Sequence, residues 1–362
     1  MTEFQRVHEI LQEATGTEFT GAVARIEHCG RVVFERAYGV TRADELGRPV
    51  YCDTIFDLAS LTKLFIATLT LQTIAAGVLE LDETLARFIP EWHLDRHAAI
   101  TARTLLAHTS GMNSGADYRE IRNENVESFA LRSELIAGPG ERVIYSDLGF
   151  IALGVVLERA MGRSLSALVR GEFSHSLMFR PRAVKRLEIP ATEDDGWRGR
   201  VQGFVHDEKA YLMAGSAGHA GLFGTAADVA ALTESYLGAV QGRERGAILP
   251  NRLVREAVIE QAYDPVLRRG LGWALKTNDE NSCGRYMDFS SFGHTGFVGT
   301  CVWADPVRDV QGVLLTNAVY FGRNPATISE QAFRPRFYEA MIEDLVALSP
   351  STALRTGSVE EC

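Results

Sequence analysis

The sequence has few cysteines and no pattern that joins them. Its five cysteines, Cys29, Cys52, Cys283, Cys301 and Cys362, are odd in number and far apart, and no C-x-x-C pair occurs. A disulfide framework or a structural zinc site is therefore not expected, and the chain suits a reducing compartment.

Neither a leader nor a membrane-spanning segment is expected from the sequence. Residues 1–5 carry neither a basic cluster nor an apolar stretch, so no signal peptide is expected. The longest apolar run, residues 64–79, is interrupted by threonine and glutamine and is too short to cross a bilayer. It predicts a buried core helix, and the two absences predict a cytoplasmic protein without a membrane partner.

The chain has no excess of basic residues. Asp and Glu number 47, Lys and Arg number 37, and the formal net charge is -10. With no basic patch in the sequence, a nucleic-acid partner is not expected and a small-molecule substrate is favoured. The 46% hydrophobic content is ample for a full core. Nothing in the sequence indicates an oligomeric state.

Strand patterns lie at both ends of the chain, and helical patterns fill the middle. Apolar residues at helical spacing cover residues 3–14, and a hairpin is expected at 21–38. Later strands are expected at 270–276, 285–289, 293–304 and 310–317, followed by a closing helix over about 325–348.

Pairing the early hairpin with the late strands gives an α+β fold, in which N- and C-terminal helices cover one antiparallel sheet. We expect a discontinuous sheet lobe from residues 1–78 and 238–348, a mostly helical lobe from 79–237, and a polar tail at 349–362. A cleft between two such lobes is a common place for a ligand site.

The first chemical pattern is Ser60-Leu61-Thr62-Lys63, at the start of the apolar run. Ser60 and Lys63 are three residues apart, so they share one face of the expected helix. Serine is a weak nucleophile until a base takes its proton, and a lysine with apolar neighbours can take part in that step. The same spacing also arises by chance, as an N-cap serine followed by a solvated lysine.

Two later stretches favour catalysis: Tyr145-Ser146-Asp147 before a second expected helix, and His294-Thr295-Gly296 entering a strand. In this order and spacing, the three stretches resemble the penicillin-recognising serine hydrolases, which include class C β-lactamases, penicillin-binding proteins and family VIII carboxylesterases. Residues 105–111 are similar to a loop-supporting stretch of that superfamily. The resemblance spans about residues 5–345 and implies a two-lobe β-lactamase/transpeptidase-like fold.

The resemblance implies a role for each residue. Ser60 is expected to attack a carbonyl and become acylated, while Lys63 and Tyr145 share the removal and relay of its proton. A phenol needs a nearby cation to act as a base, and Lys63 is placed to supply it. The backbone N–H groups of Ser60 and Phe297 are expected to form the oxyanion hole. Gly296 is expected to leave room for a substrate along the strand edge.

Two residues of the expected substrate site depart from the superfamily's pattern. Asp147 stands where asparagine is usual, and an ionised carboxylate can only accept hydrogen bonds, so it is expected to pair with Lys63 or to repel an anionic substrate. His294, which precedes Thr295 and Gly296 of the same site, stands where a cation is usual and is mostly neutral at pH 7. Both changes weaken the anchor for a substrate carboxylate and favour neutral esters or amides over penicillins.

A fourth stretch, residues 205–224, is rich in glycine and contains His219. It resembles a segment of a bacterial branch of the superfamily that includes peptidoglycan-fragment amidases. His219 is therefore a candidate substrate contact, although a tight structural loop explains the stretch equally well.

Two other stretches of the sequence offer rival site types. Residues 214–218 resemble a nucleophile elbow at Ser216, which predicts an α/β-hydrolase, but an elbow needs a strand before it and a helix after it. His93 and His97 are four residues apart, yet the glutamate of a zinc helix and a third ligand are missing from the pattern. No metal and no cofactor are expected.

Together the patterns predict a serine hydrolase that cleaves a small-molecule ester, amide or peptide through a Ser60 acyl-enzyme. Within the superfamily, the alternatives are a β-lactamase, a D-Ala-D-Ala carboxypeptidase or muropeptide amidase, or acyl transfer to an acceptor other than water. A non-catalytic penicillin-binding or acylation-sensor protein is an alternative of another class.

Overall fold

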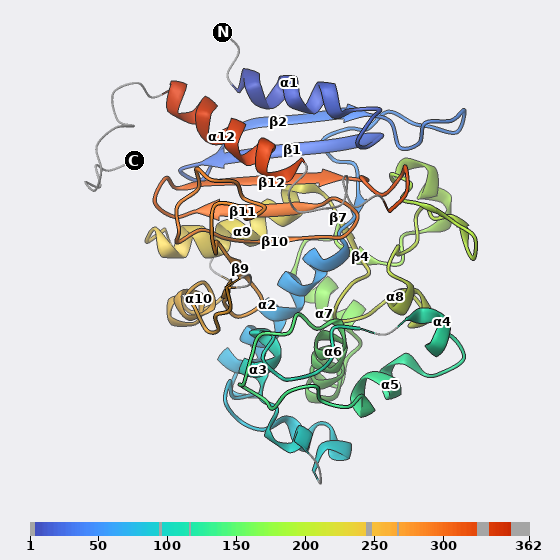
Figure 1. The fold of residues 1–362 in the computed structure, drawn as a ribbon, viewed down its shortest axis with the longest axis vertical. Helices are drawn as coiled ribbons and strands as arrows, with labels where there is room; N and C mark the ends of the chain where they lie inside the picture. Colours follow the sequence, from blue (N-terminus) through green and yellow to red (C-terminus); the bar gives the residue numbers. More distant parts are fainter. Residues whose placement is uncertain are drawn as a thin grey trace.

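One antiparallel sheet joins the two ends of the chain. The computed structural model describes residues 4–93, 96–115, 117–243, 248–265, 268–323 and 333–348. In Figure 1 the sheet forms the upper half of the molecule and a group of helices forms the lower half. The strand order within the described ranges is β2-β1-β12-β11-β10-β9-β8, so the early hairpin lies beside the last strand. The predicted α+β class and the pairing of the two ends are confirmed.

The strands of this sheet are short on one side and long on the other. They are β1 (Gly21–His28), β2 (Arg31–Gly39), β8 (Arg268–Arg269), β9 (Ala274–Leu275), β10 (Phe292–Thr295), β11 (Cys301–Asp305) and β12 (Val310–Thr316).

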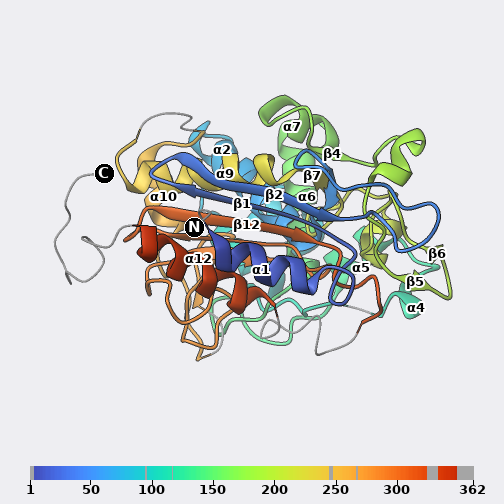
Figure 2. The ribbon, with the colours of Figure 1, turned by 90° about the horizontal axis from the view of Figure 1, so that it is seen from above.

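Alternating side chains bury both faces of the sheet. Ala24 lies opposite Leu314, and both belong to the core under α1 (Gln5–Ala14) and α12 (Arg334–Leu348). These two helices run side by side across the sheet in Figure 2. Val23 lies opposite Leu315, and both join the core on the other face, which α9 (Ala226–Val240) covers.

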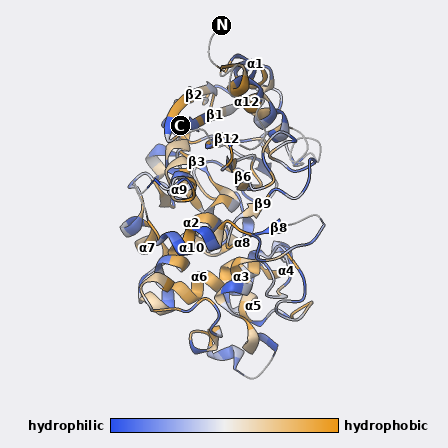
Figure 3. Cartoon of the chain, turned by 90° about the vertical axis from the view of Figure 1, so that its left-hand side faces the viewer, coloured by the Kyte–Doolittle hydropathy of each residue, from blue (hydrophilic) through white to orange (hydrophobic). Residues whose placement is uncertain are grey.

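The helix after Ser60 is buried on nearly all sides. It is α2 (Thr62–Ala75), and it packs against α6 (Asp147–Met161), most of which is coloured hydrophobic in Figure 3. The hydroxyls of Thr68, Thr70 and Thr73 donate to carbonyls four residues earlier at 2.7 to 2.8 Å. These bonds satisfy the polar groups inside the core. The predicted buried core helix is therefore confirmed, and it ends at Ala75.

Shorter elements complete the described part. Further helices are α3 (Ala102–Leu106), α4 (Tyr118–Ile121), α5 (Val126–Arg132), α7 (Leu165–Glu172), α8 (Glu208–Leu212) and α10 (Asn251–Ala257), with 3-10 helices at Ala59–Leu61, Leu85–Arg87, Pro90–Trp92, Arg96–Ala99 and Ala183–Glu188. A small sheet has the order β3 (Phe56–Asp57), β7 (Leu222–Gly224), β4 (Met178–Phe179), and β5 (Asp194–Asp195) pairs with β6 (Gly199–Arg200).

The strand predictions near the end of the chain were partly wrong. The expected strand 293–304 is two strands, β10 and β11, because the Gly296 N–H donates to the Thr300 carbonyl at 2.7 Å and closes a turn. Residues 285–289 form bends and turns, and β9 is the only strand within 270–276. The expected start of the last helix near residue 325 and the whole tail, 349–362, lie outside the described residues.

The division into lobes stays a prediction. Helix α9, most of which falls within the expected helical lobe 79–237, packs on β12, β1 and β11 of the sheet. Among the described helices, none has both the length and the apolar character to cross a bilayer.

Candidate active site

A strained turn ahead of α2 carries Ser60. This residue lies in the 3-10 helix Ala59–Leu61, and Ala59 has φ 46°, in the left-handed region that disfavours residues other than glycine. The Asp57 carboxylate holds the turn, because it accepts from the Ala59 N–H at 2.8 Å and from the His206 N–H at 2.7 Å. Backbone strain that is held in place by several bonds is typical of functional sites.

Lys63 is fully buried beside Ser60. Its Nζ donates to Ser60 Oγ at 3.0 Å, to Asp147 Oδ1 at 2.9 Å and to the His219 carbonyl at 3.0 Å. An ammonium has three hydrogens, so all of them are used. Burial disfavours the charge, but Asp147 and Tyr145 more than offset burial and raise the pKa of Lys63. Lys63 is therefore a cation in the resting site.

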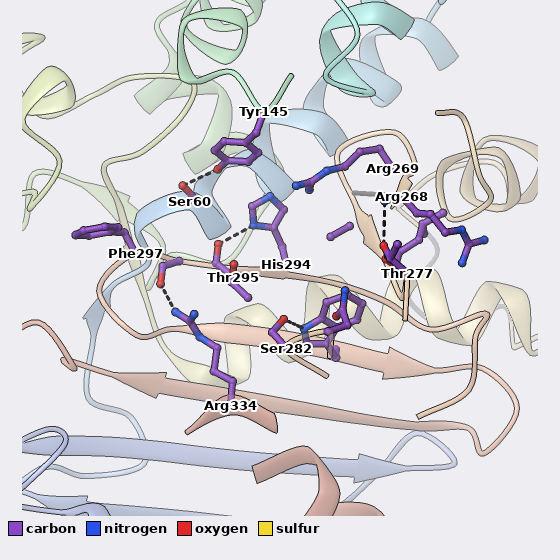
Figure 4. Close-up of a pocket in the computed structure, with 15 residues that line it drawn as sticks. Ser60, Tyr145, Arg268, Arg269, Thr277, Ser282, His294, Thr295, Phe297 and Arg334 are labelled. Carbon is purple, nitrogen blue, oxygen red and sulfur yellow. Dashed lines mark hydrogen bonds between the residues drawn. The ribbon is translucent and has the colours of Figure 1, made fainter. Parts of the chain in front are cut away.

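Tyr145 approaches the same serine from the loop before α6. Its hydroxyl donates to Ser60 Oγ at 2.9 Å (Figure 4), and Lys63 Nζ lies 5.0 Å from the centre of its ring. The ring packs on that of His108, with 4.6 Å between centroids. His108 Nδ1 in turn accepts from the Ser146 N–H at 3.0 Å. These contacts fix the phenol where it can exchange a proton with Ser60 next to a cation.

His294 forms the β10 side of the site. It lies between Tyr145 and Thr295 in Figure 4, and its Nδ1 donates to the Thr295 carbonyl at 2.7 Å. Burial, followed by the charges of Arg269 and Lys63, lowers the pKa of His294 well below its ordinary value. The ring is therefore neutral, as the sequence led us to expect.

Gly296 brings β10 against the turn of the nucleophile. A Cβ at this position would overlap Thr300 Oγ1 and would lie 2.9 Å from the Leu58 carbonyl oxygen, next to Ala59. The space that glycine leaves is thus filled by the chain itself, whereas we had expected it to admit substrate. Its small size sets the distance between β10 and Ser60.

A pocket of about 270 Å³ opens between Ser60 and the end of the sheet. Its lining includes residues from all three sequence stretches and from β8, β9 and α12. The predicted site residues that it brings together are Ser60, Tyr145, His294, Thr295, Gly296 and Phe297.

Phe297 lies in the turn between β10 and β11, and its side chain is 46% exposed. Ser60 and Phe297 line the same pocket, as an oxyanion hole requires. The assignment of the hole to their backbone N–H groups stays a prediction.

Three arginines in the pocket were missed by the sequence reasoning. Arg334 donates to the Gly296 carbonyl at 2.6 Å (Figure 4), and Arg268 donates to Glu260 Oε2 at 2.7 Å. The guanidinium of Arg269 lies 5.3 Å from the centre of the Tyr145 ring. These residues lie outside the three catalytic stretches, and the Arg268-Arg269 doublet was the one signal that could have drawn attention to them.

Asp147 and the His219 side chain are placed behind Ser60 and do not line the pocket. The expected pairing of Asp147 with Lys63 is confirmed. The His219 ring is 1% exposed and its Nε2 lies 2.7 Å from Asp207 Oδ1, so its contact with the catalytic group is made by its backbone carbonyl. A Cβ at Gly218 would overlap the Phe150 carbonyl of α6, so this loop is packed on a helix.

The two rival sites are not assembled. Ser216 follows α8 and precedes β7, which is the reverse of the strand–turn–helix order of a nucleophile elbow. His93 is exposed, whereas His97 is buried with its Nε2 2.9 Å from the Ser133 carbonyl.

One group of residues has the donor atoms of a metal site. Oxygen and nitrogen atoms of Asp147, Asp207 and His219 lie within 4.8 Å of one another. However, Lys63 Nζ and Lys209 Nζ lie 2.9 Å and 3.3 Å from the Asp147 oxygens. A metal cation there would face two ammonium groups, so the donor set does not fit a metal.

The family follows from a comparison with known proteins. A family model described as Beta-lactamase matches residues 7–333. The chain belongs to the beta-lactamase family. It is 28% identical to an N-acetylmuramyl-L-alanine amidase of Bacillus subtilis (strain 168), over 87% of this chain and 81% of that protein. It is 29% identical to esterase EstB of Burkholderia gladioli, over 85% of this chain and 89% of that protein.

A solved structure agrees with this assignment. EstCE1, a hydrolase with promiscuous acyltransferase activity, superposes with a TM-score of 0.72 at 23% identity, covering 92% of this chain and 98% of that chain. The predicted superfamily, the β-lactamase/transpeptidase-like fold and the serine hydrolase class are confirmed. This beta-lactamase-family protein is a serine hydrolase.

Proposed function

We propose that this beta-lactamase-family hydrolase cleaves small neutral esters or amides through an acyl-enzyme on Ser60. The observation that carries the proposal is the hydrogen-bonded group of Ser60, Lys63 and Tyr145 at the wall of the pocket. Relatives named as an esterase and an amidase support both bond types.

In the proposed reaction, Ser60 Oγ attacks the carbonyl carbon of the substrate and its proton passes to the Tyr145 oxygen. Tyr145 takes this proton in its phenolate form, and the Lys63 ammonium lies 5.0 Å from the centre of its ring. The oxyanion is held by the Ser60 and Phe297 N–H groups. Tyr145 then protonates the leaving group, the carbonyl reforms, and water repeats the steps to release the acid.

The preference for neutral substrates rests on the wall around His294. Its ring is neutral, and the Asp147 carboxylate lies behind Ser60, so neither residue anchors a substrate carboxylate. Arg268 and Arg334 line the pocket but already donate to Glu260 and Gly296.

Arg269 favours a second candidate function. Its guanidinium lines the pocket beside the Tyr145 ring, where it can attract a carboxylate next to the scissile bond. The second candidate is therefore a carboxypeptidase or β-lactamase activity on carboxylate-bearing amides.

The nucleophile is tested with p-nitrophenyl butyrate and by intact mass. We expect a burst of nitrophenol and the mass of one butyryl group, both lost in Ser60→Ala, with a fall in kcat/KM of about 10³-fold or more. Ser216→Ala is the matched control and is expected to keep the burst. Full activity in Ser60→Ala would refute the proposal.

The substrate class is tested by comparing kcat/KM for p-nitrophenyl esters, benzylpenicillin and a D-alanyl-D-alanine peptide. Neutral esters are expected to be the best substrates of the panel. A higher kcat/KM for either carboxylate-bearing substrate, abolished in Arg269→Met, would establish the second candidate instead.

A further inference from the structure

A chain of paired charges runs behind Ser60, and the mechanism described so far uses only its first two members. Lys63 Nζ lies 2.9 Å from Asp147 Oδ1, and Asp147 Oδ2 lies 3.3 Å from Lys209 Nζ. Lys209 Nζ lies 3.4 Å from Asp207 Oδ2, and Asp207 Oδ1 lies 2.7 Å from His219 Nε2. These five residues are called the charge chain below.

The charge chain closes on itself at the catalytic lysine. The His219 carbonyl accepts from Lys63 Nζ at 3.0 Å, so both ends of the chain meet at one ammonium. Asp207 is fixed separately, because its Oδ1 accepts from the Ala210 N–H at 2.8 Å. The Lys209 side chain is only 11% exposed. A displacement of any member is therefore passed on to Lys63.

The lysines and aspartates of the charge chain balance one another. Burial disfavours the charge on Lys209, but Asp207 and Asp147 more than offset burial and raise the pKa of Lys209. Burial also acts against ionised Asp147, but Lys63, His219 and Lys209 keep the pKa of Asp147 below its ordinary value. Two ammonium groups thus face two carboxylates.

The charge chain explains how aspartate is accommodated at position 147. The superfamily resemblance leads one to expect asparagine there, whose amide both donates and accepts. A carboxylate has no hydrogen to donate, but Lys209 places a donor on the oxygen that faces away from Lys63. The aspartate and Lys209 together supply the acceptor and the donor of an amide.

We propose that Lys209 is a positioning residue of this hydrolase, which orients Asp147 and thereby holds Lys63 in register with Ser60 and Tyr145. The proposal rests on the Ser60 acyl-enzyme of the proposed function. Without Lys209, Asp147 keeps Lys63 as its partner and Asp207 keeps His219, and Lys63 is drawn toward Asp147 and away from Ser60. The surplus negative charge also opposes loss of the Tyr145 proton.

Other groups that face the charge chain do not replace Lys209. On the side of Lys63, burial lowers the pKa values of His108 and His294, so both are neutral. Arg269 lies on the pocket side of the Tyr145 ring. On the side of Asp207 lie Asp57 and His206, and the His206 ring is 3.0 Å from Glu193 Oε1. In the described part of the chain, Lys209 is the lysine that forms ion pairs with both Asp147 and Asp207.

The test uses Lys209→Met and Lys209→Arg in the full-length protein with p-nitrophenyl butyrate. Lys209→Met is expected to lower kcat about tenfold to a hundredfold with little change in KM, because a displacement of about 1 Å in a catalytic group has effects of that size. Its kcat–pH profile is expected to rise at higher pH than that of the wild type. Lys209→Arg keeps the charge and is expected to recover most of the activity.

A double variant separates positioning from a general loss of stability. Asp147→Asn combined with Lys209→Met removes one charge of each sign and restores the amide, so its kcat is expected to exceed that of Lys209→Met. Lys185→Met is the matched control, since this lysine is 62% exposed and pairs with Glu188. It is expected to behave as the wild type.

Two outcomes would overturn the inference. One is a wild-type kcat and pH profile in Lys209→Met, and the other is a lower melting temperature with an unshifted pH profile and no recovery in the double variant. Mass detection of acyl-Ser60 in the wild type keeps the two proposals apart. If Ser60 is not acylated, the proposed function fails; if it is acylated and Lys209→Met is unaffected, only the role of Lys209 fails.

Discussion

The two sides of Ser60 differ in how their charged and neutral groups are arranged. Toward α6 and α8 lies the charge chain, where each carboxylate is paired with a cation or a histidine. Toward β10 lies the pocket, where His294 is buried and neutral although three arginines also line it. The wall at His294 is called the neutral side below. Next to Tyr145, His108 is neutral for the same reason, which is burial.

This difference separates proton handling from substrate selection. A buried charge is costly unless it is paired, so removal of one member of the charge chain affects all the others. His294 carries no charge that a substitution elsewhere could leave unpaired, so a change at His294 acts mainly on what the pocket admits. Substitutions on the charged side are therefore expected to affect rate and stability, and those on the neutral side to affect specificity.

The largest effect is expected for Lys63→Met on the charged side. It removes the ammonium that contacts Ser60 and faces the Tyr145 ring, and it leaves Asp147 with one cation fewer. We expect kcat/KM for p-nitrophenyl butyrate to fall about 10³- to 10⁴-fold. A loss of less than tenfold would show that the charged side is not the proton-handling side.

The next largest effect is expected for Asp147→Asn, as a loss of stability. The substitution removes the carboxylate that pairs with Lys63 and leaves Lys209 with Asp207, so a buried positive charge is no longer balanced. We expect a loss of about 3 kcal/mol in the free energy of unfolding, measured by urea denaturation near neutral pH. An unchanged urea midpoint would mean that water reaches the charge chain and screens its charges.

The catalytic residues and the main sheet were predicted from the sequence. The ordered stretches at Ser60, Tyr145 and His294 resemble a known superfamily and so predicted a hydrolase, and strand patterns at both ends of the chain predicted the sheet. The Asp147–Lys209 pair was not predicted, because ion pairing between residues far apart in sequence leaves no local pattern. Arg269 reaches the pocket from β8 for the same reason.

The turn between β10 and β11 was not predicted, for a different reason. Residues 293–304 are mostly apolar and read as one strand, while the glycines that permit the turn also occur inside strands. His219 was expected to contact substrate because its segment resembles one of the superfamily, but the glycine-rich loop packs on α6 and the buried His219 side chain does not line the pocket.

On the neutral side, His294→Lys is expected to change specificity. A cation at this position can bind a substrate carboxylate through a charge-assisted hydrogen bond, which contributes about 1.5–3 kcal/mol, or roughly tenfold to a hundredfold. We expect the ratio of kcat/KM for benzylpenicillin to that for p-nitrophenyl butyrate to rise by this factor. His294→Gln, which stays neutral, is the control, and an equal rise there would assign the effect to shape.

The buried histidines and the charge chain are also expected to lose stability over different pH ranges. Folding lowers the pKa values of His108 and His294, so their neutral forms stabilise the fold above the unfolded value of about 6.5, and this contribution is lost as the pH falls further. Folding raises the pKa values of Lys63 and Lys209 and lowers the pKa of Asp147, so the contribution of the charge chain is lost only in strong alkali or in strong acid.

Urea denaturation between about pH 7.5 and 5 measures the acid side of this difference. Each histidine is expected to lower the free energy of unfolding by up to about 1.4 kcal/mol per pH unit below about 6.5. His294→Gln is expected to halve the slope. A flat profile over this range would contradict buried neutral histidines.

The smallest effect is expected where an ion pair is exposed. Arg103 Nε and Nη2 bind the two Asp82 oxygens at 2.7 and 2.8 Å, but the Asp82 side chain is 68% exposed and Arg103 keeps a second partner in Glu256. Asp82→Asn is the same substitution as Asp147→Asn, so the two differ in burial and in what remains unpaired. We expect the free energy of unfolding of Asp82→Asn to fall by less than about 1 kcal/mol, and by still less in high salt, with kcat unchanged. If the two substitutions lowered the free energy of unfolding equally, burial would not explain why substitutions on the charged side of Ser60 are destabilising.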